Sequence, residues 1–376
     1  MTAPRPRASL AELFRVFLHL GLIGFGGPAA HLALMEREAV ERRGWLSHTE
    51  FLDLVGGCNL LPGPSSTQVA MALGYRRAGW LGLIVAGICF ILPASLATLA
   101  LAWAYVRYGR MPQVAGVLYG AKPVMVAIVL QAVWRLGRRA MRGWMPALLG
   151  VASFAAALAG APPVLVLLAA GGLLLALAWR QSNGTSAAGL ALLPAGLPVA
   201  ATLSLGSIAL VFLKLGVVVF GSGYVLLAFL QADLVDRLHW LTASQILDAV
   251  TAGQITPGPV FATATFLGYL LRGWQGAAVA TVAIFLPSFF LAGAVGALAS
   301  RLRRSPLAGA FLDGVNAAAV ALMASVGLVL GRAALTDRWT WALGLVSAAL
   351  LVFSEVNATW LILAGAAAGV LLQTLR

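Results

Sequence analysis

The sequence predicts an all-α polytopic membrane protein made of two homologous halves with broken helices, and three observations support this fold class. The 376 residues are 61% hydrophobic and only 10% charged, with a mean hydropathy of +0.94, whereas soluble domains carry about 25% charged residues. No Asp, Glu, Lys or Arg occurs from Gly143 to Trp179, and one spanning helix needs about 20 apolar residues. The third observation is an internal repeat.

The repeat aligns the first half of the chain with the second. An offset of 195 positions pairs Trp45 with Trp240, Asp53 with Asp248 and Pro62-Gly63-Pro64 with Pro257-Gly258-Pro259. After one residue of slip, an offset of 194 pairs Gly74-Tyr75 with Gly268-Tyr269 and Lys122 with Asn316. Because the order of motifs is preserved, shared composition does not explain the match.

Charged or proline-rich connections delimit six apolar elements in each half. In the first half, the first element starts where apolar sequence begins, and the second follows Trp45-Leu46-Ser47. The third follows Arg76-Arg77, the fourth follows Arg107, and the last two are separated by Pro162-Pro163. The expected elements are residues 10–35, 51–75, 80–106, 114–134, 144–160 and 163–179, and then 203–230, 246–271, 274–299, 307–330, 339–352 and 356–372. We expect a first repeat over residues 1–180, a linker or extra crossing over 181–202, and a second repeat over 203–376.

The distribution of arginines predicts that the two repeats are inserted in opposite orientations. The densest cluster of the first half, residues 135–142, follows the fourth element, whereas that of the second half, residues 301–304, follows the third. Those two connections lie on opposite sides of the membrane within one repeat. Since cytoplasmic loops collect Lys and Arg, both clusters are cytoplasmic only if the halves are inverted. The same rule explains the net charge of +13, so we expect no nucleic-acid partner.

The two Pro-Gly-Pro elements are the expected substrate site. Each proline removes a backbone donor and wedges the preceding turn apart, so a helix over residues 51–75 must break. The freed N–H groups and the positive helix end then form an anion site, with short polar side chains beside it. A kink tolerated for packing is the alternative interpretation. The residues concerned are Pro62, Gly63, Pro64, Ser65, Ser66, Thr67 and Gln68, and in the second copy Gln254, Thr256, Pro257, Gly258 and Pro259.

A second break is expected at glycine-rich sequence in the first element of each half. It includes Gly26 and Gly27 in the first copy and Gly221, Ser222 and Gly223 in the second. Small residues permit an unwound turn beside the first break, and equally they permit close helix packing. Both interpretations stay open at this point.

Ionisable residues within apolar sequence are further candidates. Lys122, with Asn316 at the equivalent position, could neutralise an anion, or it could extend its ammonium group to the interface. His31, Glu36 and Asp53 are candidates for proton coupling, although Asp53 could simply favour a helix N-terminus. No metal-ligand spacing occurs, and we expect no metal and no cofactor.

Several linked motifs resemble the signature of the CHR family of chromate ion transporters. They are Phe25-Gly-Gly-Pro-Ala-Ala-His31, Arg43-Gly-Trp45-Leu46, Asn59-Leu-Leu-Pro-Gly-Pro-Ser65, Gly74-Tyr75-Arg-Arg-Ala-Gly79 and Phe90-Ile-Leu-Pro93. The resemblance covers essentially the whole chain and adds Asn59 to the expected site. It implies a carrier in the bacterial inner membrane that exports chromate, coupled to an ion gradient, and confers chromate resistance.

Two other functions remain open beside this one. Sulfate resembles chromate in charge and shape, so sulfate or another oxyanion is an alternative substrate. An intramembrane enzyme would need a buried nucleophile, metal or redox centre, and the sequence offers none with suitable spacing. The expected partners are the oxyanion and the lipid bilayer, with a homodimer as a further assembly.

Overall fold

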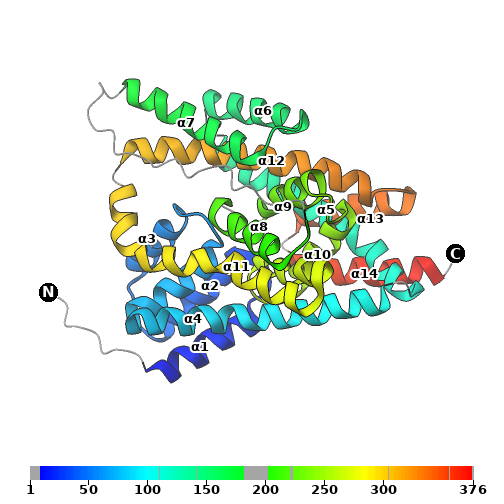
Figure 1. The fold of residues 1–376 in the computed structure, drawn as a ribbon, viewed down its shortest axis with the longest axis horizontal. Helices are drawn as coiled ribbons and strands as arrows, with labels where there is room; N and C mark the ends of the chain where they lie inside the picture. The colour runs from blue at the N-terminus through cyan, green and yellow to red at the C-terminus, as the bar shows by residue number, and fades with distance from the viewer. Residues whose placement is uncertain are drawn as a thin grey trace.

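In the computed structural model, each α-helix of the first half has an equivalent in the second (Figure 1). The structure describes residues 9–109, 111–141, 143–181, 202–220, 223–303, 305–354 and 356–374. Within these ranges the chain is helical and contains no strand, as the sequence predicts. The helices of the first half are α1 (Leu10–Ile23), α2 (Gly27–Glu36), α3 (His48–Cys58), α4 (Ser65–Tyr108), α5 (Pro112–Ala140), α6 (Trp144–Leu158) and α7 (Pro163–Gln181).

The second half repeats this order. Its helices are α8 (Leu205–Val218), α9 (Leu226–Leu230), α10 (Ala243–Ile255), α11 (Thr263–Arg303), α12 (Pro306–Ala334), α13 (Arg338–Phe353) and α14 (Ala358–Thr374). One π-helix follows α2 (η1, Arg37–Arg42) and another follows α9 (η2, Gln231–Arg237), while a short 3₁₀ turn (η3, Val260–Ala262) precedes α11. The π-helices carry equivalent ion pairs, Glu38 with Arg42 at 3.3 Å and Asp233 with Arg237 at 3.2 Å.

The chain reverses direction at the first Pro-Gly-Pro element. Arg77, near the end of the first part of α4, stacks its guanidinium 5.5 Å from the ring of Trp45, which lies just before α3. The helix that enters the break therefore starts on the same side of the membrane on which the helix that leaves the break ends. The predicted break is present, but it joins the two arms of a re-entrant hairpin rather than two parts of a crossing helix.

A second, sharper reversal divides α4. Ala78 and Gly79 leave the helical conformation, with φ of +62° at Gly79. Gly74 and Gly82 are then in direct backbone contact, although residues eight apart in a straight helix are about 12 Å apart. Residues 80–108 thus form a separate crossing helix that packs against the returning arm. α11 turns in the same way at Arg272 and Gly273.

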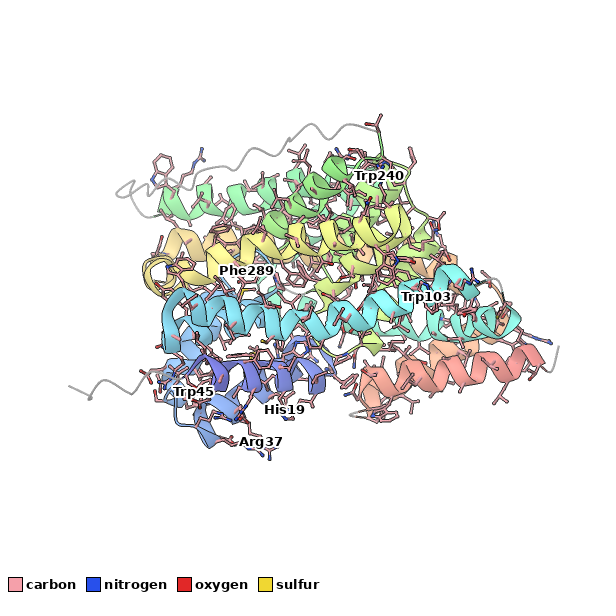
Figure 2. All side chains as sticks on the ribbon, turned by 60° about the horizontal axis from the view of Figure 1, so that its bottom comes forward. His19, Arg37, Trp45, Trp103, Trp240 and Phe289 are labelled. Carbon is pink, nitrogen blue, oxygen red and sulfur yellow. The ribbon has the colours of Figure 1, made fainter. Side chains whose placement is uncertain are left out.

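The crossing parts of α4 and α11 are equivalent in the repeat and run antiparallel. Trp80, at the start of one, packs on Gly293, near the end of the other. Figure 2 shows Trp45 and Trp240, another equivalent pair, toward opposite ends of the molecule. The halves are therefore inverted, as the arginine distribution predicts.

We name the two faces of the molecule by the helix turns that they hold. We call the end that holds the turn of α4 the basic face; it carries Arg42, Arg43, Arg76, Arg77 and the C-terminal end of α5 with Arg138 and Arg139. We call the end that holds the turn of α11 the opposite face. Arg43 bridges to Glu12 at 2.7 Å, which fixes the start of α1 at the basic face.

The last two helices of each half pack against the other half. α13 and α14 cover α5, whereas α6 and α7 cover α12. Glycines allow close approach at these contacts, since Gly120 of α5 touches Gly365 and Gly369 of α14. The linker or extra crossing expected over residues 181–202 lies, from 182 to 201, outside the described residues.

Among the residues that the structure describes, five helices, α4, α5, α7, α11 and α12, are long and apolar enough to cross a membrane. Large apolar side chains such as Leu81, Val282 and Phe290 are more than half exposed. Such exposure suits contact with lipid, because lipid chains are as apolar as the side chains themselves. The protein is a multi-pass membrane protein.

Candidate functional site

The two Pro-Gly-Pro elements connect the halves through a reciprocal pair of hydrogen bonds. The N–H of Gly63 donates to the carbonyl of Val219 at 2.7 Å, and the N–H of Gly258 donates to the carbonyl of Gly24 at 2.7 Å. Gly24 and Val219 occupy equivalent positions where α1 and α8 end. Each bond thus satisfies a terminal carbonyl of one half with an amide of the other. These two glycine amides are committed to the protein and do not face a substrate.

His31 is fully buried and ties three segments of the first half together. Its Nε2 lies 2.9 Å from the carbonyl of Gly24, and its Nδ1 lies 3.2 Å from the hydroxyl of Ser66. Because a carbonyl only accepts, Nε2 carries a hydrogen, and in the neutral ring Nδ1 accepts from Ser66. Phe90 holds the ring edge-on at 5.3 Å. The second half has Leu226 at this position, so the bridge exists in one half only.

Helix N-termini of the first half therefore converge on the membrane interior. α2 begins at Gly27 and α4 at Ser65, both beside the breaks and both without a side-chain cap. Each uncapped N-terminus presents free N–H groups and about half a positive elementary charge. At the negative, C-terminal end of α1, the carbonyl of Gly24 accepts hydrogen bonds from Gly258 and His31. The remaining electrostatic character of this region favours an anion.

Buried hydroxyl groups without partners lie near the first break. Thr67 and Ser288 are fully buried, and neither side-chain oxygen has a hydrogen-bond partner among the described residues. Ser288 reaches the break itself, since a Cβ on Gly63 would lie 2.9 Å from its oxygen. Gln68 also folds over the break and donates from its amide nitrogen to the carbonyl of Pro62. Unsatisfied donors in a low-dielectric interior are costly unless a ligand completes them.

Some polar groups of the second copy bond within the protein, although the amide nitrogen of Gln254 and the hydroxyl of Thr263 have no hydrogen-bond partner among the described residues. Thr256 bonds to the carbonyl of Gly253 at 3.0 Å and pairs with Thr98 at 3.3 Å. Thr359 donates to the carbonyl of Gln254 at 3.2 Å. Ala94 takes the place that Ser288 holds at the first break. The two breaks are therefore equivalent in backbone and unequal in polar chemistry.

The model of the chromate transporter family matches residues 11–176 and again 206–370. This chain belongs to the chromate transporter family. The double match agrees with the two inverted halves seen in the fold.

Curated relatives agree with this assignment. A probable chromate transport protein of Synechococcus elongatus is 35% identical over 91% of this chain and 90% of its own length. A chromate transport protein of Cupriavidus metallidurans is 34% identical over 96% of this chain and 92% of its own. A third, from Pseudomonas aeruginosa, is 31% identical over 87% and 82%. No solved structure matches the chain.

The other predicted residues of this chromate transporter family member lie in different surroundings. Lys122 pairs with Asp248 at 3.1 Å and donates to Ser244 at 2.7 Å, so its charge is already matched by a carboxylate. Glu36 pairs with His48 at 2.6 Å where η1 begins. Asn59, Asp53 and Asn316 are exposed, Gly26 is exposed and Gly27 buried, and Gly223 packs on Val260. Gly221 and Ser222, also predicted for the site, lie outside the described residues.

Sequence reasoning missed Ser288, Thr98 and Asn357. A Cβ on Gly26 would lie 3.2 Å from the amide nitrogen of Asn357. A signal existed for Ser288, because it follows Pro287, the repeat partner of Pro93. No local pattern marks the other two, since each reaches the site from the opposite half.

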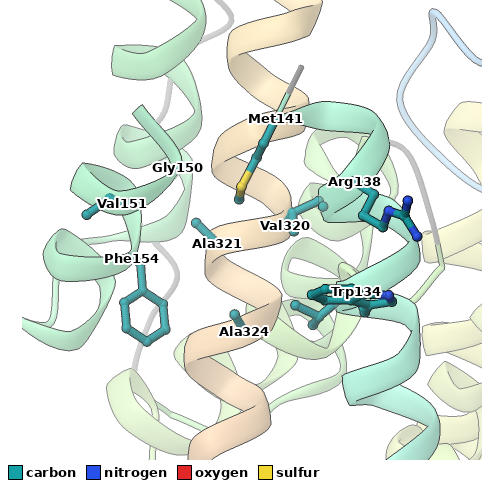
Figure 3. A pocket seen from close by; sticks show the side chains of 11 residues that line it. Trp134, Arg138, Met141, Gly150, Val151, Phe154, Val320, Ala321 and Ala324 are labelled. Atoms are coloured by element: carbon teal, nitrogen blue, oxygen red, sulfur yellow. The ribbon is translucent and has the colours of Figure 1, made fainter. Parts of the chain in front are cut away.

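A cavity of about 460 Å³ lies elsewhere, between α5, α6 and α12 (Figure 3). Its walls are apolar side chains such as Phe154 and Val320, with Trp134 and the stem of Arg138 on α5. It lacks the converging donors of the Pro-Gly-Pro region and is not a candidate anion site.

Proposed function

We propose that this protein exports chromate from the cytoplasm across the inner membrane, coupled to an ion gradient, and so confers chromate resistance. Membership of the chromate transporter family and the names of its relatives support chromate as the substrate. The basic face would be cytoplasmic, because cytoplasmic segments of membrane proteins collect arginine.

One observation supports the site assignment: the uncapped N-terminus of α4 follows a break beside which the buried hydroxyls of Thr67 and Ser288 have no hydrogen-bond partner among the described residues. A tetrahedral dianion must lose water to enter the membrane interior, so several preorganised donors are needed to offset its desolvation. Helix N–H groups and hydroxyls supply them without a permanent charge. An absence of full cationic charge there would also favour release, because a dianion held by buried arginines would leave slowly.

Transport into everted membrane vesicles tests this function. Vesicles that contain the protein should accumulate chromate faster than protein-free vesicles, and an imposed pH gradient should change the rate. Sulfate should compete more weakly than chromate if chromate is the preferred substrate. Equal or better uptake of sulfate would make sulfate the substrate, and no uptake of either anion would refute the proposal.

Two substitutions test the site. Thr67→Val and Ser288→Ala each remove one hydroxyl donor with little change in shape. A hydrogen bond to a charged group contributes about 1.5–3 kcal/mol, so each should raise the chromate concentration at half-maximal rate about tenfold or more. Ser325→Ala is the matched control, since this buried serine donates to the carbonyl of Leu322 on its own helix. Unchanged kinetics in both variants would place the anion elsewhere.

A further inference from the structure

Equivalent helices of the two halves are packed very differently. Leu52 on α3 is 51% exposed, whereas Leu247, its repeat partner on α10, is fully buried. Asn59 at the end of α3 is exposed, while its partner Gln254 is 5% exposed. The residues 52, 53, 56 and 59 lie on one face of α3. The same face of α10 is covered.

The difference comes from additional helices that pack against α10. α10 packs against α5, α12 and α14 in addition to α4 and α11. Among the described residues, α3 packs mainly against α4 and α11, and its contacts with α12, α5 and α7, the mirror partners, are marginal. α9 packs against α12, while its equivalent α2 makes no comparable contact with α5. The opposite face is therefore closed and the basic face is open at equivalent places.

A polar cluster holds the closed side together. Lys122 of the first half pairs with Asp248 of the second at 3.1 Å, and Tyr105 donates to the same carboxylate at 3.0 Å. The mirror partners of the ion pair are Asn316 and Asp53, and both are exposed. They lie on α12 and α3, whose mutual contact is marginal in this structure.

Exposed polar groups on the open side indicate water rather than lipid. Asn59 ends α3 at the depth of the first Pro-Gly-Pro break, and Asn316 and Asp313 lie within the long apolar helix α12. A polar side chain exposed to hydrocarbon is strongly disfavoured, so such residues face a water-filled space or the protein interior. Together they would line a path from the basic face to the break.

We propose that the structure is one of two mirror-related transport states, open to the basic face, in which Lys122 and Asp248 are the gate of the opposite face. In the other state α3 moves against α12 and brings Asp53 to Asn316, while α10 separates from α5. The gates are unequal, because one is an ion pair and the other joins a carboxylate to an amide. The stronger ion pair favours the state seen here. This proposal rests on the proposed transport function.

Cysteine reactivity tests the gate without using any substrate. In a background with Cys58→Ala and Cys89→Ala, the single substitutions Asn59→Cys and Gln254→Cys place a thiol at equivalent positions of the two halves. With a water-soluble maleimide and purified protein in detergent, the thiol at 59 should react at least tenfold faster than the thiol at 254. Similar rates at both positions would overturn the proposal.

Breaking the ion pair should invert this preference. With Lys122→Met, labelling at 254 should rise and labelling at 59 should fall, each several-fold, because the closed side loses its gate. Asn316→Ala is the matched control on the other gate and should leave position 254 protected. The charge exchange Lys122→Asp with Asp248→Lys should restore the original pattern, which a merely misfolded variant would not do.

Unchanged labelling rates at positions 59 and 254 in the Lys122→Met variant would refute the gate. A failure of chromate transport with this labelling pattern intact would refute the proposed substrate instead and leave the two states standing.

Discussion

Gly63 and Gly258 hold a backbone conformation that other residues adopt only with strain. Their φ angles are +106° and +98°, in the left-handed half of conformational space. Space is also lacking, because a Cβ on Gly258 would lie 2.7 Å from the Cβ of Ala94. Both glycines also donate the hydrogen bonds that connect the halves, so conformation, close approach and bonding coincide at one residue.

Gly258→Ala should therefore destabilise the protein. The positive φ costs about 1–2 kcal/mol, and the contact with Ala94 adds to this cost. We expect a lower melting temperature in detergent and slower transport. Gly172→Ala on α7 is the control, because nothing lies within 4 Å of its Cβ and its φ is not positive; it should melt at or slightly above the wild-type temperature. An equal effect of both substitutions would contradict this account.

The candidate site was predictable from sequence to the extent that its chemistry is local. The prolines and the glycine between them stand out because proline and glycine act on their own backbone. His31 stands out as an ionisable residue within apolar sequence. The acceptor of Gly63 is the carbonyl of Val219, and no pattern in either segment indicates that pairing. Thr98 and Asn357 were missed for the same reason.

The hairpin turns within α4 and α11 explain how each re-entrant arm is fixed to its crossing helix. Small residues at Gly74 and Gly82 let two antiparallel helices touch through their backbones. The sequence predicts separate elements that end and begin here. It does not predict that they fold back on each other, because the direction of the chain after Gly79 depends on what the arms pack against.

Gly74→Val should force this hairpin apart. A Cβ at Gly74 would overlap the carbonyl oxygen of Gly82, and overpacking of this kind typically costs about 1–3 kcal/mol. Thermal unfolding followed by dye binding to Cys58 and Cys89, both buried in the native protein, would measure the loss. Gly309→Val on α12, where nothing lies within 4 Å, should unfold close to wild type. Wild-type unfolding of Gly74→Val would mean that the close contact is unimportant.

The exchange of terminal helices makes the two halves interdependent. α5 depends on α13 and α14 for its cover, and α12 depends on α6 and α7. An isolated half would leave these small-residue faces exposed to lipid, without the close van der Waals packing that drives helix association in membranes.

Expression of the first half alone should consequently give little stable protein. A chain cut within residues 182–201 and expressed as two fragments should accumulate when both fragments are present, as measured by immunoblotting of washed membranes. The intact chain provides the reference level. Equal accumulation of the first fragment with and without the second would contradict the interdependence of the halves.

The amino-acid sequence was sufficient for the membrane class, the repeat, its inversion and the positions of the breaks. Each of these depends on hydropathy, on charge near helix ends or on the backbone geometry of proline and glycine, which are properties of short segments. The re-entrant course of α3 and α4, the exchange of helices and the unequal packing of α3 and α10 came from the fold. They depend on contacts between segments far apart in the chain, and the balance among such contacts has no local signature.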